Sequence, residues 1–189
     1  IEEHLKEVEK DNRVSTWSFT LNKVLPPIPE KLKGARKDLD KMKFGSALKK
    51  VEAVVEKLEG DDKTNGDALR EWIAKRGDEP MEKAATLTRE GDVYAAYKLY
   101  GQVEADFKGH TLSKQAKDAA KALTKDKAHK LEIKAGEKLD EAKVAMREER
   151  KPEDKLECLK GILGKKYAET KAGKEAAEIA EKLEGMIEK

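Results

Sequence analysis

The sequence predicts an all-α protein, built as an array of about eight antiparallel helices. Three observations predict this class: apolar residues recur in steps of three and four, a helix-loop-helix pattern repeats, and the composition suits exposed helices. Of the 189 residues, 42% are charged and only 5% are aromatic. Long solvent-exposed helices have such a composition. The regular apolar spacing argues against disorder, the other state that so many charges could indicate.

The helix-loop-helix pattern recurs at an offset of sixty residues. Six apolar positions agree at the same spacing on both sides of one loop, and a shared loop length is harder to obtain by chance than shared helices. The matched positions are Leu99 and Leu159, Val103 and Leu163, Phe107 and Tyr167, Ala116 and Ala176, Ala120 and Ala180, and Leu123 and Leu183. A unit used more than once predicts a stacked helical repeat.

Two regions differ in pattern. Residues 1–29 are expected to form a short N-terminal helix and a proline-rich connector, because three prolines cluster near its end and prolines block helix continuation. Residues 30–189 are expected to form the helical repeat domain, with approximate units 30–77, 78–125 and 126–189. The chain begins at Ile1 without Met, which indicates a processed chain or part of a longer one.

Turn-forming residues set the expected helix ends. The segment Gly60–Gly66 is rich in Asp and Asn and is predicted to be a loop. At Gly77–Pro80 the pattern favours a stop and restart with Asp78 as the N-cap, and a continuous helix kinked at Pro80 is the alternative. Lys151 and Pro152 are expected to end a long helix, and two final helices are predicted at about 153–166 and 171–188.

Charge and cysteine content exclude several functions. The 41 basic and 39 acidic side chains are finely mixed and give a net charge of +2, so we expect no nucleic-acid partner. No apolar run approaches the length of about 20 residues that spans a bilayer. The single cysteine, Cys158, excludes an internal disulfide framework and a four-cysteine metal site.

One stripe of lysines has two interpretations. Lys114, Lys117, Lys121 and Lys125 share one side of a predicted helix. The stripe is interpreted first as a solvated face whose lysine stems cover alanines. A docking site for an acidic partner or a phosphate backbone is the alternative.

Residues of catalytic type are scattered. The three histidines His4, His110 and His129 share no ligand spacing, and Cys158 has no matched histidine. Nucleophilic catalysis needs a nucleophile within hydrogen-bond reach of a base, with a third group that orients the base. We therefore expect neither an enzyme nor a metal or cofactor site.

The segment 78–125 resembles the tetratricopeptide repeat family. Ala84, Leu87, Gly91, Ala96 and Tyr100 have the spacing of that family's two packing helices and turn, and residues 43–51 look like an earlier copy. The third copy departs from the pattern at Lys151, Leu156 and Lys160, where the family has glycine, alanine and an aromatic residue. The resemblance covers roughly residues 30–188 and implies a right-handed array of paired helices.

The loops of two copies carry a second resemblance. Residues 106–116 and 165–176 are similar to a variant found in bacterial envelope proteins, in which an aromatic, a short loop with threonine and a downstream alanine join successive helices. Outer-membrane assembly lipoproteins and Tol-Pal coordinators share this variant, and related helical segments follow thioredoxin-like domains. The likeness implies an exported, periplasmic or cell-envelope location, with the cytoplasm left open. The sequence contains no Cys-x-x-Cys motif that would carry redox chemistry.

The resemblance also implies a groove. The first helix of each pair lines the concave face of tetratricopeptide arrays, and a groove of mixed charge suits a protein or peptide better than a small molecule. We therefore expect a non-catalytic scaffold or adaptor that binds other proteins. The alternative is a structural arm of a larger protein or complex. The candidate groove residues are Asp78, Met81, Ala85, Thr88, Arg89, Lys138, Glu141, Glu148 and Glu149.

Overall fold

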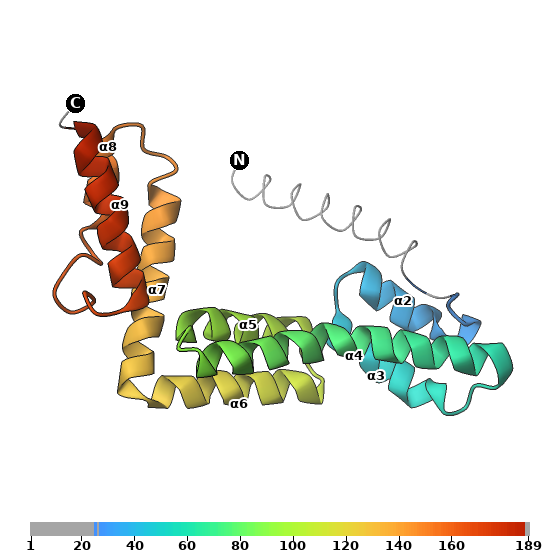
Figure 1. Ribbon diagram of the computed structural model, residues 1–189. Helices are drawn as coiled ribbons and strands as arrows, with labels where there is room; N and C mark the ends of the chain where they lie inside the picture. The colour runs from blue at the N-terminus through green and yellow to red at the C-terminus, as the bar shows by residue number, and fades with distance from the viewer. Residues whose placement is uncertain (1–24, 26, 188–189) are drawn as a thin grey trace. The chain divides into compact units, whose positions relative to one another are not determined.

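A computed structural model describes Leu25 and residues 27–187. Within these residues the chain forms one short 3-10 helix, eight α-helices and no strand, which confirms the all-α class (Figure 1). In chain order the elements are η1 (Glu30–Leu32), α2 (Lys33–Asp40), α3 (Phe44–Val55), α4 (Gly60–Arg89), α5 (Val93–Asp106), α6 (Thr111–Lys125), α7 (Lys127–Ala145), α8 (Pro152–Leu159) and α9 (Lys171–Ile187).

The helices divide into two compact units. Unit 1 contains 1–83 and 99–118, and unit 2 contains 84–98 and 119–189, in each case as far as the structure describes them. The predicted N-terminal helix lies outside the described residues, as does most of the proline-rich connector. Of that connector, Leu25 and Ile28 pack against the core of unit 1.

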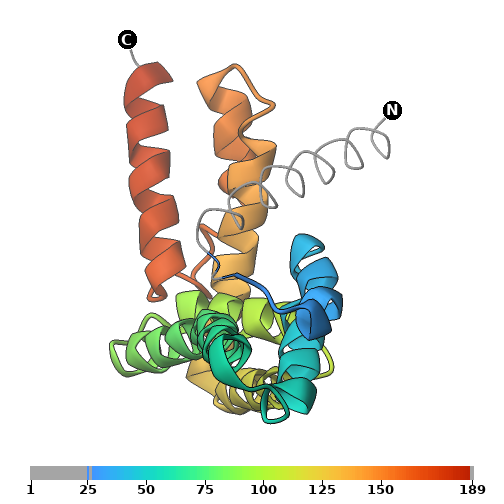
Figure 2. The same cartoon turned by 90° about the vertical axis from the view of Figure 1, so that its right-hand side faces the viewer.

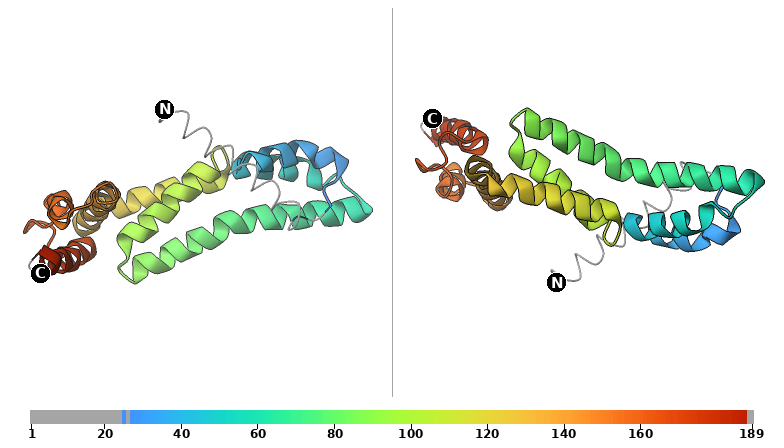
Figure 3. Two further views of the ribbon diagram at one scale, coloured as in Figure 1. Left: turned by 90° about the horizontal axis from the view of Figure 1, so that it is seen from above. Right: turned by 90° about the horizontal axis from the view of Figure 1, so that it is seen from below.

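Unit 1 has a core of large apolar side chains. Figures 1 and 3 show α2 and α3 as neighbours alongside the first part of α4. Phe107 is fully buried in this core. The centroid of its ring lies 6.0 Å from the centroid of the Phe44 ring. Gly45 lets α3 approach the same residue, since a Cβ at this position would lie 2.4 Å from the carbonyl oxygen of Phe107.

Unit 2 has a core rich in alanine. Figure 2 shows α9 beside α7, and α9 packs on both α7 and α8. Helix α7 begins after Asp126, whose carboxylate accepts the main-chain N–H of His129 at 2.8 Å and caps the helix. Pro152 stands at the start of α8, where its missing N–H costs no hydrogen bond.

The predicted loop at Gly60–Gly66 is wrong, because these residues form the first two turns of α4. Acidic residues in the first turn favour a helix N-terminus. Lys63 and Arg70 both donate to the carboxylate of Glu56, at 2.9 and 3.0 Å, and hold the new helix against the end of α3.

The stop and restart predicted at Gly77–Pro80 is also wrong, and the alternative of one continuous helix is correct. Pro80 has no N–H to donate to the carbonyl four residues earlier, which weakens the helix locally. Packing offsets this loss, since Gly77 is buried where a Cβ would lie 2.9 Å from Phe107 and Leu112. The boundary expected between units 30–77 and 78–125 thus falls inside α4. The three-unit scheme itself remains a prediction.

The last helical pair is shorter than predicted. Helix α8 ends at Leu159 instead of near residue 166. In the turn after α8, Ile162 is 1% exposed and Leu163 is 39% exposed. Ile162 is therefore the buried residue here, although the repeat pattern matches Leu163 with Val103. The reason is a tight turn in which the Ile162 N–H donates to the Leu159 carbonyl at 2.9 Å.

The two loops compared in the sequence share one turn. The His110 N–H donates to the carbonyl of Phe107, and the Thr170 N–H donates to the carbonyl of Tyr167, each at 2.9 Å. Phe107 and Tyr167 are both buried. The two segments therefore agree in local geometry as well as in apolar spacing.

Candidate functional site

The clearest hollow of unit 2 lies among the start of α5, the middle of α7 and the start of α9. Tyr94, from the first turn of α5, lies directly against α7. This close approach depends on Gly136, because a Cβ there would be 2.2 Å from the Tyr94 ring. The glycine thus sets the position of the aromatic side chain that forms one wall.

Tyr94 is fixed at its polar end as well. Its hydroxyl donates to Oδ2 of Asp140 at 2.7 Å, and Nζ of Lys98 donates to the same oxygen at 2.9 Å. Burial alone would raise the pKa of Asp140, but the hydrogen bonds from Lys98 and Tyr94 outweigh it and hold that pKa below its ordinary value. Burial and the neighbouring Asp140 carboxylate raise the pKa of Tyr94, so its hydroxyl remains a donor.

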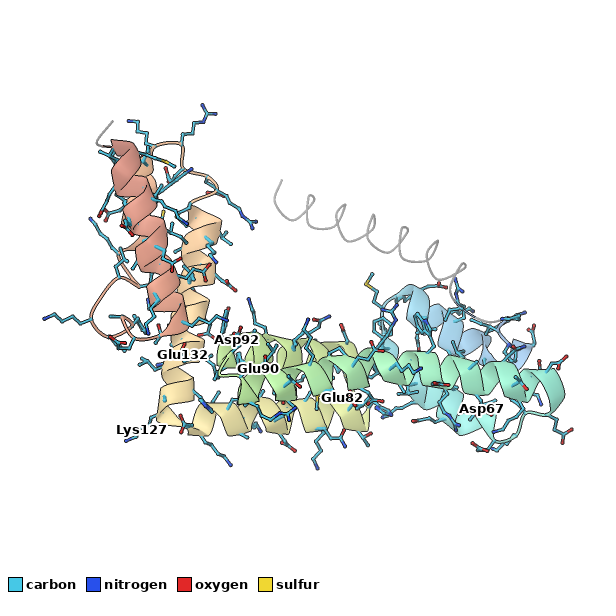
Figure 4. All side chains as sticks on the ribbon, in the orientation of Figure 1. Asp67, Glu82, Glu90, Asp92, Lys127 and Glu132 are labelled. Carbon is cyan, nitrogen blue, oxygen red and sulfur yellow. The ribbon has the colours of Figure 1, made fainter. Side chains whose placement is uncertain are left out.

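The other charges of this hollow also pair with one another. Lys171 contacts Asp92 through its ammonium, and its main-chain N–H donates to Glu132 at 3.1 Å. Figure 4 shows Asp92 and Glu132 close together, from the start of α5 and from α7. Lys143 pairs with Glu175 at 2.6 Å. The lysines and carboxylates that line this hollow therefore form ion pairs and hydrogen bonds with one another. These contacts connect α5, α7 and α9.

A second, shallow groove in unit 2 follows the outer side of α7 and shares Tyr94 and Asp140 with the hollow. Its floor includes Val144, which is 58% exposed and is the most exposed of the large apolar residues on α7. Carboxylates rim it. The lining consists of Tyr94, Glu137, Asp140, Glu141, Val144, Ala145 and Glu148. We call this the α7 groove.

The structure places the predicted groove residues in several locations. Glu141 and Glu148 line the α7 groove, whereas Lys138 and Glu149 do not. The other five lie on α4: Asp78 and Met81 in unit 1, and Ala85, Thr88 and Arg89 in unit 2. None of these five lines the α7 groove.

Two of the α4 residues bond within their own helix. The Thr88 hydroxyl donates to the Ala84 carbonyl at 2.9 Å, and the Arg89 guanidinium donates to the Thr86 hydroxyl at 3.0 Å. Whether any of the predicted groove residues binds a partner stays a prediction.

Sequence reasoning missed Glu137, Asp140 and Val144 as groove residues. The positions 137, 141, 144 and 148 follow helical spacing, so this face of α7 could have been read from the sequence. Tyr94 and Gly136 lie far apart in the chain, so no local sequence pattern predicts the contact between them.

Residues of catalytic type have local structural contacts. His110 Nε2 lies 3.3 Å from a carboxylate oxygen of Glu52, and the Cys158 thiol donates to the Asp154 carbonyl at 3.4 Å. Among the described residues, no group of three or more His, Cys, Asp or Glu side chains is arranged to hold a metal ion. In the same part of the chain, no helix is both long enough and apolar enough to cross a membrane.

The chain matches no protein-family model, no curated protein and no solved structure.

Proposed function

We propose that this chain is a non-catalytic protein–protein interaction module, a scaffold or adaptor that binds a segment of a partner protein in the α7 groove. The exposed Val144 on the floor of a carboxylate-rimmed groove carries the proposal. An apolar floor with a polar rim is the usual anatomy of a protein interface.

The wall of the groove is held in place before any partner binds. Asp140 and Gly136 position the Tyr94 ring, so the tyrosine loses little conformational freedom on binding. Tyrosine is also among the residues that contribute most to binding energy at interfaces. The openness of the groove suits a helix or an extended segment better than an enclosed small molecule.

The finer description of the protein follows from resemblance. We propose a tetratricopeptide-like helical repeat in an exported or cell-envelope protein of a bacterium. The resemblance at residues 78–125 and the matched loops after Phe107 and Tyr167 support this description. The proposed module uses no cofactor.

A structural arm of a larger protein or complex is the second candidate. Met186 and Ile187, on the last turn of α9, are 63% and 41% exposed. Adjacent apolar side chains of this kind suit coverage by a neighbouring domain or subunit. Such an arm could follow a thioredoxin-like domain, as related helical segments do.

Site-specific photo-crosslinking in native cells tests these proposals. A benzophenone amino acid is placed at Val144, at Met186, and at the exposed Ala53 of α3 as the matched control. We expect position 144 to give one dominant crosslinked protein that position 53 does not give. A dominant crosslink at 186 alone would support the arm. The same weak products at all three positions would contradict both proposals.

A further inference from the structure

A groove in unit 1 lies where α5 ends and α6 begins, and no function has been assigned to it above. Small residues form its floor, and lysines stand along its sides. The lining is Gly101, Glu104, Ala105, Lys108, Gly109, His110, Ser113, Lys114 and Lys117. Gly109 has a φ of +85°, a conformation that favours glycine and that turns the chain sharply into α6. We call this the α5–α6 groove.

The α5–α6 groove carries a net positive charge. Lys117 pairs with its one carboxylate, Glu104, at 3.2 Å. Lys108 and Lys114 are exposed, and among the described residues neither has a carboxylate within ion-pair distance. Among the residues that the structure describes, these two cations of the groove thus have no ion-pair partner.

The main chain of Glu104 also links the two helices. Its main-chain carbonyl accepts the Ser113 hydroxyl at 2.8 Å, which ties the end of α5 to the first turn of α6. The imidazole of His110 faces Glu52. The loop is therefore fixed by its own contacts, and the positions of Lys108 and Lys114 follow from a defined turn.

We propose that the α5–α6 groove binds an acidic segment of a partner protein. Lys108 and Lys114 would meet its carboxylates, while the floor of Gly101, Ala105 and Gly109 lets a peptide backbone approach closely. Charge complementarity of this kind contributes to the specificity for a partner and to the rate of association.

The lining favours a protein over a nucleic acid. Single-stranded nucleic acids are held by aromatic side chains on which bases stack, and phosphates favour the bidentate guanidinium of arginine. Of the residues that the structure describes, neither an arginine nor a tryptophan, tyrosine or phenylalanine lines the α5–α6 groove. Lysine ammonium groups act as point charges and suit carboxylates in any orientation.

The probe is a fluorescein-labelled 12-residue peptide of alternating Asp and Ala, measured by fluorescence anisotropy at low salt. Its neutral counterpart alternates Asn and Ala. The test variant is Lys108→Glu with Lys114→Glu. The matched control is Lys37→Glu with Lys57→Glu, which changes the net charge equally on exposed lysines of unit 1 outside the groove.

We expect the test variant to weaken binding of the acidic peptide by about tenfold and the control variant by less than about threefold, on the scale of exposed charge pairs. Amide chemical shifts induced by the peptide should gather in residues 101–117. If charge reversal prevents folding, the neutral pair Lys108→Gln and Lys114→Gln should still weaken binding by about threefold.

Three results would overturn the proposal. The neutral peptide could bind as tightly as the acidic one, or the control variant could lose as much affinity as the test variant. A single-stranded oligonucleotide that displaces the peptide at lower concentration than unlabelled peptide does would assign the groove to phosphate. The α7 groove takes no part in this experiment, so its proposed function is tested separately.

Discussion

The two units of this protein have similar helical patterns and different cores. In unit 1, three of the fourteen clustered core residues are alanine, and the rest are mainly leucine, valine, isoleucine and phenylalanine. In unit 2, five of the ten are alanine. Burial of larger side chains removes more apolar surface from water, so unit 1 gains more stabilisation per core residue.

Both units also have polar contacts between their helices. In unit 1, Asp38 of α2 accepts the Ser46 hydroxyl at 2.6 Å and pairs with Lys50 of α3 at 2.7 Å, and unit 2 has corresponding contacts. Asp140 accepts hydrogen bonds from Tyr94 and Lys98, which join α5 to α7, and the pair Lys143–Glu175 joins α7 to α9. Alanine allows helices to approach closely, but each buried alanine removes little apolar surface from water. One apolar spacing therefore supports two cores that differ mainly in the size of the buried side chains, while directed polar contacts join helices in both units.

The largest expected difference between the units concerns their equivalent aromatic residues. Phe107→Ala should lower the free energy of unfolding of unit 1 by about 4 kcal/mol, because it empties a site packed against Phe44, Gly45 and Gly77. Tyr167→Ala should lower the free energy of unfolding of unit 2 by about 2 kcal/mol, since fewer large side chains lose a contact than in unit 1. Hydrogen exchange in denaturant, followed peptide by peptide, gives separate values. A greater loss for Tyr167→Ala would contradict the comparison.

A smaller effect is expected from the close approach of α3 to Phe107. Gly45→Ala places a Cβ against a backbone carbonyl, which cannot move aside as a flexible side chain can, and should destabilise unit 1 by about 1–3 kcal/mol. The matched control is Gly34→Ala in α2, where the nearest atom is Lys50 Cδ at 3.7 Å. This control should stabilise the protein by about 0.5–1 kcal/mol. Equal effects in thermal unfolding would refute the steric explanation.

The smallest expected effect tests the polar connection of unit 2. Because the pKa of Asp140 is lower in the folded chain, its contribution to stability is full above its unfolded pKa and is lost as pH falls through the folded pKa. Tyr94→Phe removes one donor, so the pKa of Asp140 should rise and unit 2 should lose about 1 kcal/mol near neutral pH. NMR titration of the Asp140 carboxyl carbon measures the shift.

Unit 1 supplies the control for that titration. Burial raises the pKa of Asp38, but the hydrogen bonds from Lys50 and Ser46 hold it below its ordinary value. Tyr94→Phe should leave the titration of Asp38 unchanged. A shift of both carboxyl groups would indicate a general change of structure in place of a lost hydrogen bond.

Much of the fold could be predicted from the sequence because its signals are local. Apolar spacing located α3, α5, α6 and α7, and glycine marked the turn after α4, where Gly91 has a φ of +82°. The predictions of helix ends failed where contacts with residues distant in the sequence accompany the local structure. The start of α4 contacts the end of α3 through Arg70 and Glu56, and the turn before Pro80 packs against Phe107 through Gly77.

The candidate site shows the same limit. Glu141 and Glu148 were predicted from the concave face that the tetratricopeptide resemblance implies, and they line the α7 groove, whereas Lys138 and Glu149, predicted on the same ground, do not. Tyr94 reaches the α7 groove only through its contact with Gly136, forty-two positions later in the chain. Val144 is an ordinary apolar residue in the sequence, and only its exposure in the structure distinguishes it.

Helices α4, α5 and α6 each contribute residues to both units, so neither unit is a contiguous stretch of chain. Val103, Phe107 and Ala116 complete the core of unit 1, yet they come after the segment 84–98 that belongs to unit 2. During synthesis on a ribosome, unit 1 therefore cannot be completed until about residue 118 has emerged. The whole segment 84–98 of unit 2 is made before that point, so a ribosome cannot complete unit 1 before it begins unit 2.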